Sequence, residues 1–256
     1  MPGLTRHLFF IVMAFPFFYI NNYVAEQREI VLDEDTSRHI IQVLRMKTGE
    51  QLNLTDGKGN LLNCFIVEAH KKHCSLQLDT ISTLQQGIRK VSVAISLIKN
   101  TNRFEWFLEK ATEIGVSEII PLICERTEKE KFRFDRLQGI CISAMLQSQQ
   151  TWLPKLQEPR SFKELKDWKA ENGLNFIAHC VEGNRQKLTH SHIPESAQLV
   201  PDLYRESLIC IGPEGDFTGE EIALALNNNF IPVSLGETRL RTETAGVVAA
   251  TLLCHI

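Results

Sequence analysis

The chain has 256 residues, of which 43% are hydrophobic and 23% charged, and its formal net charge at pH 7 is −3. This size and composition are those of an ordinary globular protein with one large core or two modest ones. The near-neutral charge excludes a strongly basic protein, although a local basic patch would suffice to bind nucleic acid. The seven scattered cysteines form no C-x-x-C pair, which argues against a disulfide framework or a zinc ribbon and favours a reducing cytoplasm.

The segment 8–20 is almost wholly apolar and follows Arg6 and His7, as in a signal peptide. It is too short to span a bilayer, Pro16 interrupts it, and no small-x-small cleavage site follows. We therefore expect an extension over residues 1–12 ahead of a first strand at 15–19, and neither a targeting nor a membrane segment.

Residues 35–46 are predicted to form a helix with one apolar and one polar face. The polar residues recur at i, i+4 and i+7 spacing, which places them on one stripe. The apolar positions are Ile40, Val43 and Leu44, and the polar positions are Arg38, Gln42 and Arg45.

Three strands separated by turns are predicted next, at 51–55, 61–69 and 74–81. The first turn contains Asp56-Gly57, and Asp-Gly is a strong hairpin signal. The polar stretch 82–89 is the expected linker, so the first domain would cover residues 1–86 and the second 87–256.

From Val91 onward, strand-like and helix-like segments alternate. The apolar run 91–98 is typical of a strand covered on both faces. A helix is expected to follow, with Asn102 and Glu105 as a capping box and Gly115 as its end. Its expected buried stripe consists of Phe104, Phe107, Leu108 and Ala111.

Further strands are predicted at 116–123, 176–178, 208–211 and 231–235, with helices at 135–149 and after Ser161, which would form a capping box with Glu164. Such alternation predicts a parallel sheet with flanking helices.

Two glycine-bearing loops near the C-terminus carry the chemistry. The first is Ile211-Gly-Pro-Glu-Gly-Asp-Phe-Thr218, between a strand and a helix that Thr218 and Glu221 would cap. Glycines here allow backbone conformations, or a close approach of a ligand, that a side chain would forbid.

The second loop runs from Ser234 to Arg241 and leads into a helix from about Glu243, with Thr242 as its expected cap. This helix is small and apolar throughout, so deep burial is expected. A charged arginine at the N-terminus of a buried helix is costly unless it pairs with an acid or binds a ligand. Arg241 would either pair with Glu243 or Glu214, or bind an anionic substrate.

Other nucleotide and metal motifs do not occur. There is no G-x-G-x-x-G after a strand and no G-x-x-x-x-G-K-[ST], which disfavours Rossmann enzymes and P-loop nucleotidases. The clusters His70/His73/Cys74 and His190/His192 each lack a second half, so solvated turns are favoured over a metal site.

Gly212-Pro-Glu-Gly215, followed by Leu235-Gly-x-x-x-Leu-Arg-Thr-Glu-Thr-Ala245, resembles the RsmE-type 16S rRNA uridine-N3 methyltransferases of the SPOUT superfamily. The resemblance covers nearly the whole chain. Further similar segments are 103–116, which matches a family helix ending in Glu-Leu-Gly-Val, 144–154 in the next helix, and 39–49 and 55–57 in an N-terminal PUA-like barrel.

The chain departs from this family in three places. The family commonly has a second glycine where Asp216 stands, and aspartate tolerates left-handed geometry better than most residues. Glu237 and Thr238 occupy a stretch where many members carry proline. The first dozen residues have no counterpart.

The resemblance implies an α/β SPOUT methyltransferase domain with a deep trefoil knot, behind a PUA-like β-barrel domain. It implies S-adenosylmethionine as cofactor, a homodimer with the active site near the subunit interface, and no metal. The cofactor-binding positions that it implies are His179, Gly212, Pro213, Glu214, Gly215, Ser234, Leu235, Gly236, Leu240, Thr242, Thr244 and Ala245, with the strand end at Cys180.

For methylation of N3, the enzyme must align the nucleophile and exclude water, and a base or polarising group must deal with the N3 proton. We expect Arg241 to stabilise negative charge on the uracil oxygens. Glu214 and Glu243 are both candidate proton acceptors, and the sequence does not choose between them.

The implied partner is 16S rRNA in the small (30S) ribosomal subunit, with the target base single-stranded or flipped. Arg38, His39, Arg45 and Lys47 are the expected phosphate contacts. Two other functions remain open: methylation of a ribose 2′-hydroxyl by a related SPOUT enzyme, and a non-catalytic RNA-binding role in ribosome assembly.

Overall fold

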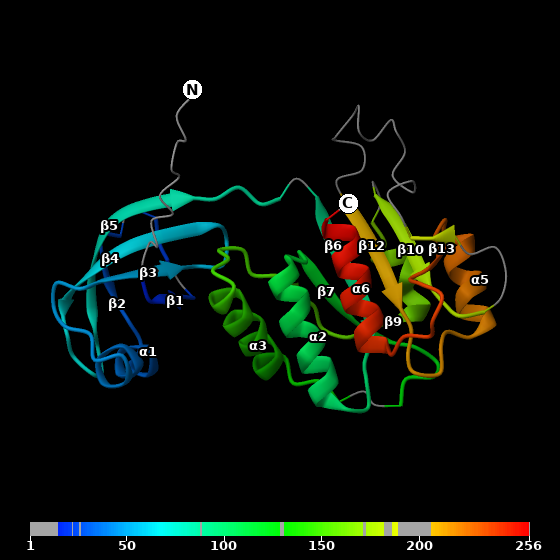
Figure 1. The fold of residues 1–256 in the computed structure, drawn as a ribbon, viewed down its shortest axis with the longest axis horizontal. Helices are drawn as coiled ribbons and strands as arrows, with labels where there is room; N and C mark the ends of the chain where they lie inside the picture. Colours follow the sequence, from blue (N-terminus) through cyan, green and yellow to red (C-terminus); the bar gives the residue numbers. More distant parts are fainter. Residues whose placement is uncertain are drawn as a thin grey trace, which may run out of the picture. The chain divides into compact units, whose positions relative to one another are not determined.

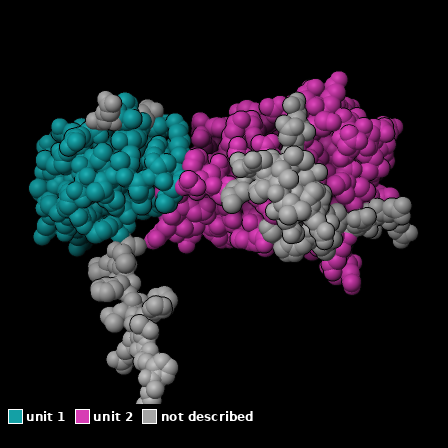
Figure 2. Space-filling view, turned by 90° about the horizontal axis from the view of Figure 1, so that it is seen from above, with its two compact units in different colours: residues 1–84 teal, residues 85–256 magenta. Residues whose placement is uncertain are grey.

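The structure is a computed structural model that describes residues 15–21, 23–25, 27–87, 89–128, 131–170, 173–181, 186–188 and 206–255. The chain divides into two compact units, residues 1–84 and 85–256 (Figure 2). The expected extension over residues 1–12 and the His190/His192 pair lie outside the described residues.

Unit 1 is a five-stranded sheet with strand order β1-β3-β4-β5-β2. The Asp56-Gly57 turn joins β3 to β4 in antiparallel register, with Thr55 opposite Leu61, as predicted. Ile40, Leu52 and Leu76 are among the side chains that fill the core of this unit. The bounds are β1 (Phe17–Tyr19), β2 (Glu29–Val31), α1 (Glu34–Arg38), η1 (His39–Val43), β3 (Gln51–Thr55), β4 (Asn60–Glu68) and β5 (Ser75–Thr83).

The helix predicted at 35–46 is shorter and differently wound. α1 continues directly into the π-helical turn η1, in which the Leu44 N–H donates to the His39 carbonyl over 3.0 Å. The wider turn breaks the 3.6-residue period. Ile40 is therefore buried, but Val43 and Leu44, expected on the same face, are 64% and 43% exposed. Arg45 lies beyond the helix with φ of 58°, so the predicted polar stripe is also wrong.

Unit 2 contains an eight-stranded sheet with the order β11-β13-β10-β12-β6-β7-β8, and β9 pairs with β7. Every described pair is parallel, as the alternation of strands and helices predicted. The strands are β6 (Lys90–Ser96), β7 (Glu118–Ile123), β8 (Lys155–Leu156), β9 (Arg160–Ser161), β10 (Leu174–Ala178), β11 (Gln186–Lys187), β12 (Glu206–Ile211) and β13 (Ile231–Ser234).

Helices cover both faces of this sheet (Figure 1). Alternate residues of one strand point to opposite faces, so Val93 and Ala94 enter different cores. One core lies under α2 (Thr101–Ile114), α3 (Phe134–Gln147) and α6 (Thr242–Cys254). The other lies under the 3-10 helix η2 (Phe162–Asp167) and α5 (Gly219–Asn227). The stripe predicted for the first helix, from Phe104 to Ala111, is buried.

Local capping was predicted correctly only in part. Thr218 and Glu221 form the reciprocal capping box of α5, and Gly115 ends α2 with φ of 95°. The cap of α2 is Asn100, however, whose Oδ1 accepts from the Asn102 N–H over 3.1 Å, so the box assigned to Asn102 is wrong. Ser161 caps η2 through the Lys163 N–H, and not through Glu164.

Most described cysteines are small buried side chains, as expected. Burial raises the pKa of the Cys141 thiol to about 11 and that of Cys210 well above its ordinary value, so both thiols stay protonated at neutral pH. Cys180 is exposed. Among the described residues, no helix is long and apolar enough to cross a membrane.

Candidate active site

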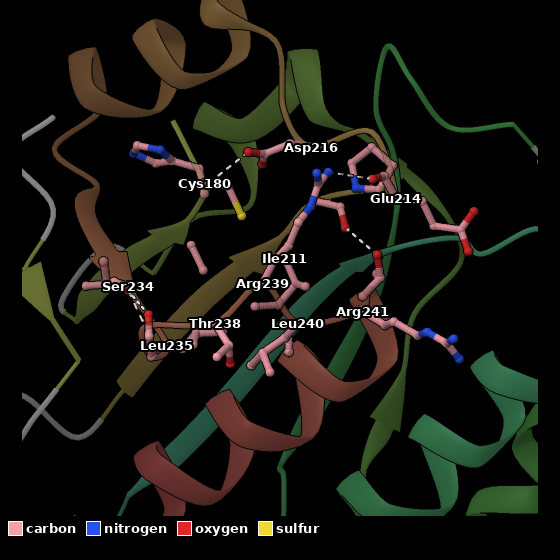
Figure 3. Close-up of a pocket in the computed structure, with 18 of the residues that line it drawn as sticks. Cys180, Ile211, Glu214, Asp216, Ser234, Leu235, Thr238, Arg239, Leu240 and Arg241 are labelled. Atoms are coloured by element: carbon pink, nitrogen blue, oxygen red, sulfur yellow. Dashed lines mark hydrogen bonds between the residues drawn. The ribbon is translucent and has the colours of Figure 1, made fainter. Parts of the chain in front are cut away.

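A pocket of about 560 Å³ lies at the carboxyl ends of β10, β12 and β13. β12 and β13 pair with opposite edges of β10, so the loops that follow them meet across the end of that strand. Ligands of open parallel sheets bind at this edge, where the strand order changes direction. The two glycine loops singled out from the sequence are therefore neighbours in space (Figure 3).

The loop after β12 is held by three side chains and one backbone N–H from other parts of unit 2. Thr242 Oγ1 donates to the Gly212 carbonyl over 3.1 Å, and Arg239 Nη2 donates to the Glu214 carbonyl over 3.3 Å. Arg126 Nη1 donates to the Gly215 carbonyl over 2.6 Å, and the Cys180 N–H donates to Asp216 Oδ2 over 2.7 Å. With these contacts satisfied, the loop is preorganised before any ligand arrives.

Two glycines of the pocket are required for different reasons. A Cβ on Gly212 would lie 3.0 Å from the ring of Phe217, which is buried directly beneath it. Gly236 has φ of 155° and open space around it, so its backbone conformation and not crowding demands glycine there.

Asp216 takes the left-handed conformation, with φ of 65°, as expected at a position where the family has glycine. Its side chain adds something that glycine cannot supply. The two carboxylate oxygens accept from the N–H groups of Cys180 (2.7 Å) and Phe217 (2.8 Å). Asp216 therefore ties the end of β10 to the loop after β12.

Arg241 is the N-cap residue of α6, is exposed, and lines the pocket. It forms no salt bridge with any residue that the structure describes. In Figure 3 its side chain points away from that of Arg239. The sequence left two roles open for Arg241, pairing with a glutamate or binding an anionic substrate. This geometry favours the second role, because the guanidinium is available to a ligand.

Arg103 of α2, and not Arg241, forms ion pairs with Glu214 and Glu243, the two acids that the sequence suggested as partners of Arg241. Its guanidinium lies 3.5 Å from Glu214 Oε1 and 3.6 Å from Glu243 Oε1. Sequence reasoning missed this residue, because helical spacing places it outside the buried stripe and Glu214 is 111 positions away. No local pattern reveals such a contact.

The two candidate glutamates differ sharply in their surroundings. The side chain of Glu214 is 48% exposed and lines the pocket. The side chain of Glu243 is 8% exposed and does not line it, and Glu243 Oε2 has no hydrogen-bond partner in the described structure. A buried carboxylate without Arg103 would be costly, so Glu243 anchors Arg103 at the base of α6.

The start of α6 also differs from the prediction. The helix begins at Thr242 after Arg241, and Thr242 is not its cap because the hydroxyl is used by the Gly212 carbonyl. Burial of this helix is nearly complete, as expected: Gly246, Ala249, Ala250 and Leu253 are buried, and of the helix residues only Thr251 is exposed.

The pocket brings together most of the expected cofactor-binding residues. Among the described residues, its charged lining consists of three arginines (Arg103, Arg239, Arg241) and three acids (Glu214, Asp216, Glu237), set among apolar walls. Expected residues in the lining are His179, Gly212, Pro213, Glu214, Ser234, Leu235, Gly236, Leu240, Thr242 and Ala245, whereas Gly215 and Thr244 lie outside it.

Residues 85–254 match the family model for an RNA methyltransferase domain, and residues 32–79 match that for an RNA methyltransferase PUA domain. The first match alone covers well over half of the chain. The chain belongs to the RNA methyltransferase family. This membership agrees with the resemblance stated from the sequence.

Curated relatives of this RNA methyltransferase carry one common name. The "Ribosomal RNA small subunit methyltransferase E" of Synechocystis sp. is 30% identical over 82% of this chain and 68% of its own length. The protein of the same name from Rickettsia conorii is 28% identical over 90% of this chain and 91% of its own.

Solved structures of similar proteins share the fold. A probable rRNA-methyltransferase from Porphyromonas gingivalis is 35% identical with a TM-score of 0.81, over 94% of this chain and all of its own. A ribosomal RNA small subunit methyltransferase E from Neisseria gonorrhoeae, bound to S-adenosyl methionine, is 26% identical with a TM-score of 0.79, over 92% and 95% of the two chains.

The four expected phosphate contacts are all exposed on unit 1 of the methyltransferase. Arg38 is already paired within its own helix, at 2.8 Å from Glu34 and 3.3 Å from Asp35. The ring of His39 meets Phe18 edge-on at 6.0 Å. Arg45 and Lys47 form no salt bridge with described residues, which leaves them the most available cations of this set.

Proposed function

We propose that this methyltransferase uses S-adenosylmethionine to methylate N3 of a uridine in 16S rRNA of the small ribosomal subunit. One observation carries the proposal: the glycine loops after β12 and β13 form a single preorganised pocket, in which the charges of the described lining residues balance. Relatives with the same fold are named small subunit rRNA methyltransferases, and one has S-adenosyl methionine bound.

The pocket fits this cofactor in size and in chemistry. A volume of about 560 Å³ is within the usual range for a site of this kind. Ile211, Leu235 and Leu240 offer apolar walls to an adenosine, while the mixed charges suit an amino acid bearing an extra sulfonium charge. Bound there, S-adenosylmethionine supplies an electrophilic methyl group.

Residues of the chain then stabilise charge on the uracil and accept its N3 proton. Arg241 faces the substrate and stabilises the negative charge that develops on the uracil oxygens as N3 loses its proton. Glu214 is the proton acceptor of the two candidates, because its side chain lines the pocket and that of Glu243 does not. Glu243 holds Arg103 in place and does not reach the pocket.

Two structural features belong to the same proposal. The chain from β13 to α6 would form a trefoil knot, supported by α6 returning from the far edge of β10 to pack against α2 and β6. The enzyme would act as a homodimer, supported by Trp106 of α2, an aromatic side chain that is 43% exposed.

We expect residues 1–86 to bind RNA and residues 87–256 to hold the cofactor, with Arg45 and Lys47 of the first part contacting phosphate.

Replacing Asp216 with glycine is expected to weaken S-adenosylmethionine binding about tenfold, with little change in kcat at saturating cofactor. Glycine accepts the φ of 65° but removes the acceptor for the Cys180 N–H, so the end of β10 is released. Loss of one charge-assisted hydrogen bond has this magnitude, about 1.5 kcal/mol. Titration calorimetry measures the affinity.

The Asp216→Asn variant is the matched control, since it keeps the left-handed conformation and one acceptor oxygen, and it should bind with intermediate affinity. Equal affinity of wild type and the glycine variant would show that Asp216 serves only the turn. Wild type that binds no S-adenosylmethionine would contradict the proposed function and favour a non-catalytic assembly factor.

A further inference from the structure

A second cavity, of about 290 Å³, lies in unit 2 between the start of α2 and the start of α3. We refer to it as the α2–α3 cavity. Its floor is apolar and its rim is basic. The floor contains Leu97, Ile98, Phe104 and Leu137, each at most 6% exposed, and the rim contains Lys131, Arg133 and Arg136 beside the half-buried ring of Phe132.

Among the described residues that line the cavity, three cations face one carboxylate, that of Glu105. Glu105 forms a bidentate pair with Arg136, at 2.7 Å and 2.9 Å, and these hydrogen bonds lower the pKa of the Glu105 carboxyl. Lys131 and Arg133 are exposed and form no salt bridge with any described residue. Two cations therefore stand over an apolar floor without a carboxylate of their own in the described structure.

The α2–α3 cavity and the pocket at the carboxyl ends of β10, β12 and β13, which we call the methyl-transfer pocket, are lined by neighbouring residues of α2. Asn102, Phe104 and Glu105 line the former, and Arg103, between them in the same helical turn, lines the latter. One turn of α2 therefore separates the two sites.

An apolar floor with an aromatic wall and a cationic rim matches the chemistry of a nucleotide. Bases of single-stranded nucleic acid stack on aromatic rings, while lysine and arginine hold the phosphates. When an enzyme extrudes its target base, the nucleotides beside it must be held as well.

We propose that the α2–α3 cavity binds a nucleotide that flanks the methylated uridine, with its base against Phe132 and its phosphate at Lys131 and Arg133. This inference rests on the proposed function, because it takes the occupant of the neighbouring pocket to be a base of an RNA strand.

The double variant Lys131→Ala/Arg133→Ala tests the charge. Its affinity for a fluorescent single-stranded uridine hexamer, measured by anisotropy, should fall at least tenfold at low salt. The slope of log affinity against log salt should fall by about 1.4, since each phosphate contact to a single strand contributes about 0.7. With 30S subunits as substrate, KM for RNA should rise while kcat and S-adenosylmethionine affinity stay unchanged.

The matched control is Lys163→Ala/Lys166→Ala, which removes the same charge from exposed positions on η2, outside both cavities. It should bind the hexamer within twofold of wild type. Phe132→Ala should lose at least fivefold in affinity without changing the salt slope, and Phe132→Trp should restore it. A merely structural role for Phe132 would instead lower the melting temperature and leave affinity unchanged.

Hexamer affinity of Lys131→Ala/Arg133→Ala equal to that of the control would overturn the proposal. Complete displacement of the hexamer by an equal nucleotide concentration of uridine monophosphate would also overturn it, because the cavity would then take free nucleotide and not a strand. Failure of the wild type to methylate 30S subunits would instead contradict the proposed function, and the binding comparison distinguishes the two failures.

Discussion

Replacing Arg241 with alanine is expected to lower kcat at least tenfold while leaving S-adenosylmethionine affinity nearly unchanged. Arg241 lines the pocket, is exposed, and forms no salt bridge with described residues, so its loss removes no described ion pair. A preorganised donor to developing negative charge typically contributes about 100- to 1000-fold in kcat, and tenfold corresponds to about 1.4 kcal/mol. Single-turnover methylation at saturating RNA measures the effect.

Two controls separate this role from simpler ones. Arg241→Lys keeps the charge but loses the planar fork, and should retain part of the activity. Arg103→Ala should reduce both turnover and melting temperature, because it leaves Glu243 buried without its ion pair. Unchanged turnover of Arg241→Ala at saturating RNA would show that the assigned role is wrong.

Gly246→Ala is expected to destabilise the protein by about 1–2 kcal/mol, although alanine is the better helix former. A Cβ at this position would lie 2.6 Å from Phe107 Cε2 and 2.8 Å from Ile95 Cδ1, and both side chains are fully buried. Contacts this short belong to the upper part of the overpacking range, about 2–3 kcal/mol, from which the gain in helix propensity of about 1 kcal/mol is subtracted.

The melting temperature should therefore fall by about 2–8 °C in scanning calorimetry. Gly219→Ala is the matched control, because it is also helical and nothing lies within 4 Å of its added Cβ. That variant should be neutral or slightly more stable. A Gly246→Ala protein as stable as the control would mean that α2 and α6 are not packed as closely as the structure shows.

The sequence predicted those parts of the fold that depend on local chemistry. Apolar runs located β6, β7, β10, β12 and β13 to within a few residues, and the spacing of Thr218 and Glu221 defined the start of α5. The two-residue strands β8, β9 and β11 were not predicted, because they are too short to form an apolar run. It did not predict the π-helical turn, because Ile40, Val43 and Leu44 fit an ordinary helix equally well. It also placed the cap of α2 at Asn102, since both Asn100 and Asn102 have capping side chains.

The sequence predicted those residues of the candidate site that belong to a recognisable glycine loop. The glycine loops that follow the strands predicted one pocket containing Gly212 and Gly236, and both residues line the same pocket. Contacts between distant segments were missed. Thr242 donates its hydroxyl hydrogen bond to the Gly212 carbonyl, 30 positions away, and does not cap its own helix. Arg103 pairs with Glu214, which is 111 positions away. Tertiary packing determines which distant residues become hydrogen-bond or ion-pair partners, and no local sequence pattern encodes these pairs.

The most direct test of the central claim is to digest 16S rRNA from a strain lacking this gene, from its parent and from the complemented deletion, and to quantify methylated nucleosides by mass spectrometry. We predict that one N3-methyluridine disappears in the deletion, returns with the wild-type gene, and does not return with Arg241→Ala. Unchanged N3-methyluridine, or loss of a 2′-O-methylated nucleoside in its place, would contradict the proposed function.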